Sequence, residues 1–180
     1  MIRVQKSFFS IVLLFSLLSC NKDETASFNV SEAATVELPG ASVSGIIIQL
    51  NSETFLTDFE VLLEDNNTTQ VLIETTVLEQ ITLSLIEPEE TSLNFLDQVT
   101  VYLKDGNGDT LLISKTDTLS SADKAARTID VSIKQRDNFI DWISKPSLSY
   151  IVKASINDFY TDKRSFEVKA AFRVDGALNQ

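Results

Sequence analysis

Apolar residues recur at every second position in several segments, and this period constrains the fold more than any other feature of the chain. A β-strand points successive side chains to opposite faces of its sheet, so a period of two predicts strands with one buried face. β-Branched and aromatic residues, which favour strands, are common in these segments. The clearest examples are 81–85, 99–103, 129–133, 148–156 and 166–174. We therefore expect an all-β protein.

Clusters of turn-forming residues separate the expected strands. Lys-Asp-Gly-Asn-Gly-Asp at 104–109 lies between two apolar strands and predicts a hairpin, and a second turn at 157–163 joins the last two strands. Helix is sparse, with short candidates at 137–143, where Asp137 could cap, and at 69–75. Seven or eight strands with one or two short helices predict two antiparallel sheets packed face to face, an Ig-like or related β-sandwich.

The first 19 residues have the layout of a cleaved leader. Arg3 and Lys6 form a positive segment, and 8–18 is apolar apart from two serines, too short to span a bilayer as a mature helix. This run ends in Leu17-Leu18-Ser19-Cys20. The arrangement resembles a bacterial lipoprotein precursor with its lipobox. The resemblance implies cleavage before Cys20 and acylation of both its thiol and its new amine, and two or three acyl chains hold a protein to a membrane stably.

The residues after the cysteine carry sorting information in that family. Asn21 is not the aspartate that retains many such lipoproteins in the inner membrane, so the resemblance implies an outer-membrane location. Lys22, Asp23 and Glu24 resemble the lysine-plus-acidic export tag that some Gram-negative groups use to reach the cell surface. Three charged residues also suit an ordinary soluble linker, which leaves periplasm-facing attachment open.

Removal of 19 of the 180 residues leaves 161, a length typical of one domain. Residues 20–35 are mostly polar and predict a lipidated flexible tether. Residues 36–180 are then expected to form a single β-sandwich domain. The predicted division is a signal peptide at 1–19, the tether and this domain.

Composition restricts the chemistry. The chain has no histidine, and its sole cysteine is the expected lipid site, which argues against Ser-His-Asp and Cys-His catalysis, ordinary zinc or copper sites and disulfides. Lys+Arg falls from 15 to 13 when Arg3 and Lys6 are removed, against 26 Asp+Glu, so the mature formal charge is −13. Such a chain repels nucleic acid. We expect no cofactor and no nucleic-acid partner.

Asp105, Asn107 and Asp109 alternate like the opening of a calcium loop, because alternate oxygen-bearing residues can converge on a hard cation. An EF-hand then needs glycine and glutamate where this chain has Thr110 and Thr116. Glycine and asparagine also supply the backbone angles of a tight turn. The turn is the favoured interpretation, and calcium remains the alternative.

Two further groups of residues suggest contact with sugars. Thr110 and Thr118 each lie in Asp-Thr-Leu, which resembles a bacterial O-glycosylation motif. Aromatic side chains that could stack on a glycan, or pack in the core or an interface, are Trp142, Tyr102, Tyr150 and Tyr160. Tyr102 is out of phase with its apolar neighbours and should point away from their face.

These features predict a non-enzymatic, lipid-anchored binding or scaffold lipoprotein of the outer membrane, whose partner is an envelope protein or a glycan. One alternative is a glycan-active enzyme that uses carboxylates such as those clustered at 87–90 and 64–65. Another is a purely structural envelope component. Grouped loop carboxylates also suit a solvated rim.

Overall fold

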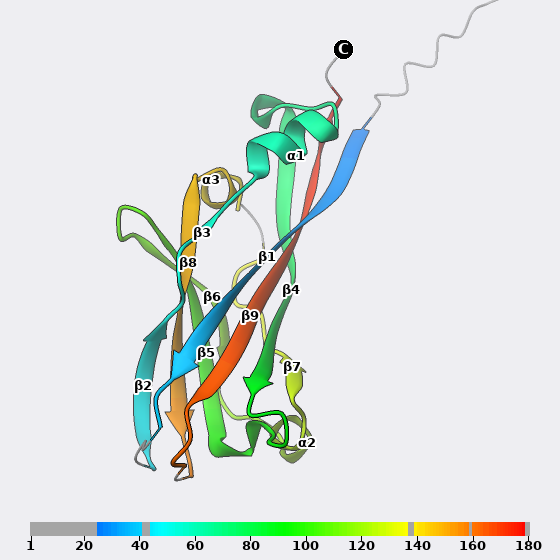
Figure 1. Cartoon of the computed structure of the whole chain (residues 1–180). Coiled ribbons are helices and arrows are strands. Elements are labelled where there is room, and N and C mark those ends of the chain that lie inside the picture. Colours follow the sequence, from blue (N-terminus) through cyan, green and yellow to red (C-terminus); the bar gives the residue numbers. More distant parts are fainter. Residues whose placement is uncertain (1–24, 41–43, 137–138, 159, 179–180) are drawn as a thin grey trace, which may run out of the picture.

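The computed structural model describes residues 25–40, 44–136, 139–158 and 160–178. Within them, nine strands form a sandwich of two sheets (Figure 1). The strands are β1 (Thr25–Leu38), β2 (Ile46–Asn51), β3 (Phe55–Leu56), β4 (Ile73–Glu87), β5 (Leu96–Asp105), β6 (Thr110–Thr116), β7 (Thr128–Asp130), β8 (Ser147–Ile156) and β9 (Arg164–Ala177). The helices are α1 (Phe59–Asp65), α2 (Ser121–Ala125) and α3 (Ile140–Ile143), with 3-10 turns η1 (Gln70–Leu72) and η2 (Leu93–Phe95).

The strand order is nested. One sheet runs β1-β9-β4-β7, and the other runs β2-β8-β5-β6 with β3 also paired to β8. All pairings are antiparallel, and β1 pairs with β9, β2 with β8, β4 with β7 and β5 with β6. This is the order of a jelly roll, in which a folded-over hairpin wraps into two sheets.

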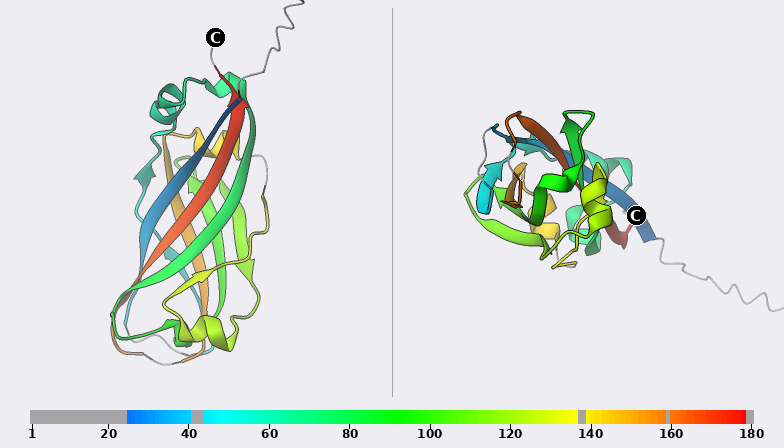
Figure 2. Two further views of the ribbon diagram at one scale, coloured as in Figure 1. Left: turned by 90° about the vertical axis from the view of Figure 1, so that its right-hand side faces the viewer. Right: turned by 90° about the horizontal axis from the view of Figure 1, so that it is seen from below.

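The predicted all-β, antiparallel two-sheet sandwich is confirmed. Its strand order is that of the related jelly roll and differs from the immunoglobulin order, a distinction that hydrophobic period cannot make. Nine strands exceed the expected seven or eight because β3 and β7 have only two and three residues. Figure 2 shows the two sheets as separate layers.

The core lies between the sheets. Every second residue of β8, from Leu148 to Ile156, is buried, and so is every second residue of β9 from Phe166 to Val174. Aromatic rings join the layers at intervals: Phe166 packs on Phe95 with ring centroids 5.8 Å apart. Burying one such side chain contributes about 1.5–3 kcal/mol, so apolar packing is the main source of stability.

The predicted tether is shorter than expected, and this is a correction. Strand β1 begins at Thr25, and its 14 residues all have partners on β9. Its inward positions include the small or modest side chains of Ala26, Val30 and Val36, which are buried. Phe28 and Leu38 lie on the same inward side, so the large apolar residues of this strand stand near its two ends. The folded domain therefore includes residues 25–35, which were predicted to be tether.

Helix predictions were partly wrong. Helix α3 lies in the expected segment but begins at Ile140, and Asp137 is outside the described residues. In the expected helix at 69–75, only 70–72 are helical, as the 3-10 turn η1, and β4 already begins at Ile73. Helices α1 and α2 were not expected, although Ser120 and Asp123 form a capping box that the sequence could have indicated.

The connection after β8 crosses between the sheets, because β8 and β9 lie in different layers.

A single arginine holds the connection that follows β4. The guanidinium of Arg127 donates hydrogen bonds to the carbonyl oxygens of Leu85 (2.7 Å), Ile86 (3.0 Å), Pro88 (2.9 Å), Thr91 (2.8 Å) and Glu89. The two terminal nitrogens of this planar cation, Nη1 and Nη2, make all five contacts with backbone acceptors. The cluster of glutamates at 87–90 therefore lies on a segment whose backbone is held in place by hydrogen bonds from Arg127.

The two ends of the sandwich differ. Figure 1 places the start of β1 beside α1 and η1 at one end, and α2 at the other. Among the described residues, none of the helices has the length and apolar character needed to cross a membrane.

Candidate functional site

The predicted lipidation site Cys20 and the predicted export tag Lys22, Asp23 and Glu24 lie outside the described residues. Strand β1 begins five residues after Cys20. Five residues span at most about 18 Å when fully extended. A lipid on Cys20 would therefore lie close to the end of the sandwich that carries α1.

The candidate calcium residues form a self-contained turn. The buried Asp105 carboxylate accepts hydrogen bonds from the backbone N–H of Asn107 (3.0 Å) and of Asp109 (2.8 Å), and it pairs with Lys145. The hydrogen bond from Lys145 is the main reason that the pKa of Asp105 lies below its usual value. The described residues contain no group of three or more His, Cys, Asp or Glu arranged to hold a metal. Protein donors thus occupy both carboxylate oxygens of Asp105.

Both candidate O-glycosylation threonines are exposed. Thr110 is the first residue of β6, immediately after the β5–β6 turn. Thr118 lies between β6 and α2, where its hydroxyl donates to the Asp117 carbonyl oxygen at 2.7 Å. Either side chain could be reached by a modifying enzyme.

The four candidate stacking residues have different environments. Tyr150 and Tyr160 are buried, so they belong to the core. Trp142 is partly buried against the core, with the Lys145 ammonium 4.5 Å from its ring centroid. Tyr102 alone of the four projects from the outer surface of a sheet, as its phase in the sequence predicted.

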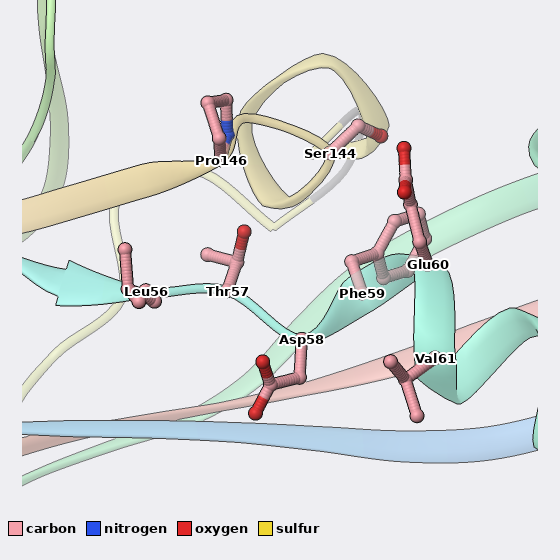
Figure 3. A pocket seen from close by; sticks show the side chains of 8 residues that line it. All are labelled: Leu56, Thr57, Asp58, Phe59, Glu60, Val61, Ser144 and Pro146. Atoms are coloured by element: carbon pink, nitrogen blue, oxygen red, sulfur yellow. The ribbon is translucent and has the colours of Figure 1, made fainter.

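A groove of about 480 Å³ lies between the β3–α1 segment and residues 144–146 (Figure 3). Leu56 and Val61 on its wall are 74% and 55% exposed. Thr57 links the two walls, since its hydroxyl donates to the Lys145 carbonyl oxygen. Figure 3 shows Asp58 and Glu60 on opposite sides of the chain, so their carboxylates do not converge within the groove.

A carboxylate that the sequence analysis did not select, Glu32, interacts electrostatically with Asp58 of this groove. Glu32 projects from β1 and is partly buried. Burial raises the pKa of Glu32, and the negative charge of Asp58 raises it further. The Tyr150 hydroxyl donates to the Glu32 carbonyl oxygen at 3.0 Å, which fixes the strand here. Glu32 was missed because it lies in the segment predicted to be a tether.

The outer surface of the five-stranded sheet forms a second candidate site. Residues directly opposite one another on antiparallel strands project from the same face, so the register defines this surface. Its rows across the strands are Asn51, Ile151, Tyr102 and Leu112; Gln49, Lys153, Thr100 and Lys115; Ile47, Ser155 and Gln98; and Lys104, Ser149 and Thr110. We call these 14 residues the lysine face. All are at least partly exposed.

The lysine face has three lysines and no carboxylate, although the chain has 26 acidic residues. The carboxylates at the ends of β5 are each paired with a lysine: Asp97 with Lys124 and Asp105 with Lys145. The outer surface of the other sheet is different. Its register aligns five carboxylates with only two cations, namely Glu37, Glu87, Asp130, Glu167 and Asp175 against Lys169 and Arg173.

Comparisons with known proteins assign no family. No protein-family model matches the chain, and no curated protein matches it. Among solved structures, the chain is similar to one described as the structure of infectious bursal disease virus Gx strain, at 11% identity and a TM-score of 0.37. The match covers 86% of this chain and 32% of that one, so this chain spans about a third of its length.

Proposed function

We propose that the chain is a lipid-anchored outer-membrane lipoprotein, displayed on the cell surface, that binds a partner without catalysing a reaction. The lipobox ending at Cys20 supports the anchor, and Lys22, Asp23 and Glu24 support export to the surface. The short distance from Cys20 to Thr25 supports a domain held close to the membrane.

The lysine face is the observation that carries the binding role. An acidic protein keeps its surface soluble with carboxylates spread over all sides, yet the 14 residues of the lysine face include none. Its partly exposed Tyr102 sits among side chains that can donate and accept hydrogen bonds. A partly exposed aromatic side chain with polar neighbours is typical of a contact surface.

Membrane fractionation and acyl labelling test the anchor. The wild-type chain should incorporate labelled palmitate and sediment with membranes, whereas Cys20→Ala should lose the label and become soluble. A Cys20→Ala chain that stays on the membrane would refute the lipobox assignment.

Protease access on intact cells tests surface display. Replacing Lys22, Asp23 and Glu24 with alanine should protect the domain from external protease, with the acyl label unchanged. Equal digestion of wild type and variant would leave these residues as an ordinary linker.

One observation favours a carboxylate enzyme as the second candidate. Glu32 combines a raised pKa with a nearby carboxylate, Asp58, and enzymes that use carboxylates for acid–base chemistry contain such pairs. Incubation of the purified chain with glycans should release no reducing ends if the binding role is correct. Turnover that Glu32→Gln abolishes, and that Lys169→Met does not affect, would establish the enzyme instead.

A further inference from the structure

We propose that the lysine face binds an acidic polysaccharide. This inference deepens the proposed binding role by naming the surface and the ligand class, and it does not depend on lipidation of Cys20.

Charge selects an anionic ligand. Among the described residues, Lys104 and Lys153 form no ion pair, while Lys115 pairs with Asp117 at 2.9 Å at the edge of the sheet. Two lysines without a carboxylate partner, on a face without a carboxylate, reduce the repulsion that a protein of net charge −11 presents to an anion.

Two of the lysines lie near an aromatic ring. Lys104 lies two positions beyond Tyr102 on β5, about 7 Å along the strand. Lys153 lies on β8 diagonally opposite, and its ammonium lies over the Tyr102 ring, 5.0 Å from the ring centroid. An anionic ligand that packs beside Tyr102 would therefore meet the Lys153 ammonium at the ring and Lys104 further along the strand.

The remaining side chains suit a sugar. Ile151 and Leu112 extend the apolar surface of Tyr102 across the neighbouring strands, and the carbon-bound hydrogens of a sugar ring can pack on such a strip. Amide and hydroxyl groups surround it, from Gln49, Asn51, Gln98, Thr100, Ser149 and Ser155. These groups both donate and accept hydrogen bonds, as sugar hydroxyls do. The open sheet surface measures about 14 by 20 Å, room for an extended chain of sugars.

Other anionic macromolecules fit less well. Single-stranded nucleic acid is held by several stacking aromatics, and this face has one. Protein interfaces concentrate Tyr, Trp and Arg in a buried apolar centre, and this face contains no arginine or tryptophan. Isolated lysines among hydroxyls and amides favour the polysaccharide.

Affinity electrophoresis tests the proposal with the full-length chain in non-ionic detergent. Gels contain polygalacturonate, chondroitin sulfate, the methyl ester of polygalacturonate as a matched uncharged polymer, or poly-L-glutamate. At least one acidic polysaccharide should retard the wild-type chain at low salt, and the methyl ester and poly-L-glutamate should not. Raising the ionic strength should weaken the retardation.

Variants locate the surface. Tyr102→Ala should weaken binding about tenfold, and Lys104→Met and Lys153→Met about two- to fivefold each. Lys169→Met removes the same charge from the outer surface of the other sheet and should leave binding unchanged. Circular dichroism and melting confirm that each variant is folded.

Several results would overturn the proposal. The first is that neither acidic polysaccharide retards the chain, and the second is that the methyl ester retards it as much as the acidic polymer does. The others are that poly-L-glutamate binds more strongly than the polysaccharides, or that Lys153→Met and Lys169→Met weaken binding equally. If the wild-type chain incorporates palmitate but binds no acidic polysaccharide, only the ligand assignment is refuted. If it binds the polysaccharide but incorporates no palmitate, only the proposed anchor is refuted.

Discussion

Replacing Arg127 with methionine should destabilise the domain by about 3 to 4 kcal/mol. The substitution keeps a long unbranched side chain and removes five hydrogen bonds to backbone carbonyls. Those to Leu85, Pro88 and Thr91 are partly buried, and those to Ile86 and Glu89 are exposed. Water replaces the exposed pair at little cost, whereas each partly buried bond contributes about 1 kcal/mol or slightly more because its donor is charged. The three partly buried bonds account for the total.

Urea unfolding followed by Trp142 fluorescence and circular dichroism measures this loss. Arg127→Lys keeps the charge but not the planar fork of donors, so it should lower the free energy of unfolding by about half as much as Arg127→Met does. Arg136→Met, at an exposed arginine, should change the free energy of unfolding by no more than about 0.5 kcal/mol. A loss below about 1 kcal/mol for Arg127→Met, or one equal to that of Arg136→Met, would show that water satisfies these carbonyls without the guanidinium.

Three further predictions concern single positions. Burial raises the pKa of Glu32 above its ordinary value of 4.5, so ionised Glu32 opposes folding, and Glu32→Gln should raise the urea midpoint at neutral pH. That gain should vanish as the pH falls below 4.5, and equal midpoints at neutral pH would contradict it. Lys145 lowers the pKa of Asp105 below 3.8, so this pair stabilises the fold at neutral pH and the contribution disappears as the pH falls through the lowered pKa. Asp105→Asn should therefore lower the melting temperature at neutral pH and flatten its decline in acid, and parallel melting curves would refute this. A Cβ at Gly176 would lie 2.5 Å from the Leu72 carbonyl oxygen, so Gly176→Ala should cost about 1–3 kcal/mol in urea unfolding, and an unchanged midpoint would show that η1 moves freely.

Side-chain size decided which strands could be predicted. From Leu148 to Ile156 in β8 and from Phe166 to Val174 in β9, every inward residue is a large apolar one except the alanines at 154 and 170, so the period of these strands was plain. β1 places Ala26, Glu32 and Ala34 on the inward parity, and its period was hidden. β9 pairs with this strand along its whole length, and a sequence pattern cannot show such a pairing.

The order of the strands and the lysine face could not be predicted from the sequence, because both depend on which strands pair. Lys104 shares the parity of Tyr102, so the sequence could place both on one side of a strand. Lys153 and Lys115 come from other strands, and only the register brings them beside it. The nested pairing likewise depends on which strands meet across more than a hundred residues.

The pairing of β1 with β9 has a mechanical consequence. In the proposed anchored state, any pull on a bound ligand would reach the membrane through the first strand of the domain. That strand is held along 14 residue pairs by its neighbour, and the pull would act at Thr25 along the strand. Hydrogen bonds perpendicular to the strands would then share the load together in shear, instead of opening one after another as in a peeled hairpin. The strand nearest the lipid would thus resist force better than a hairpin that is peeled from one end.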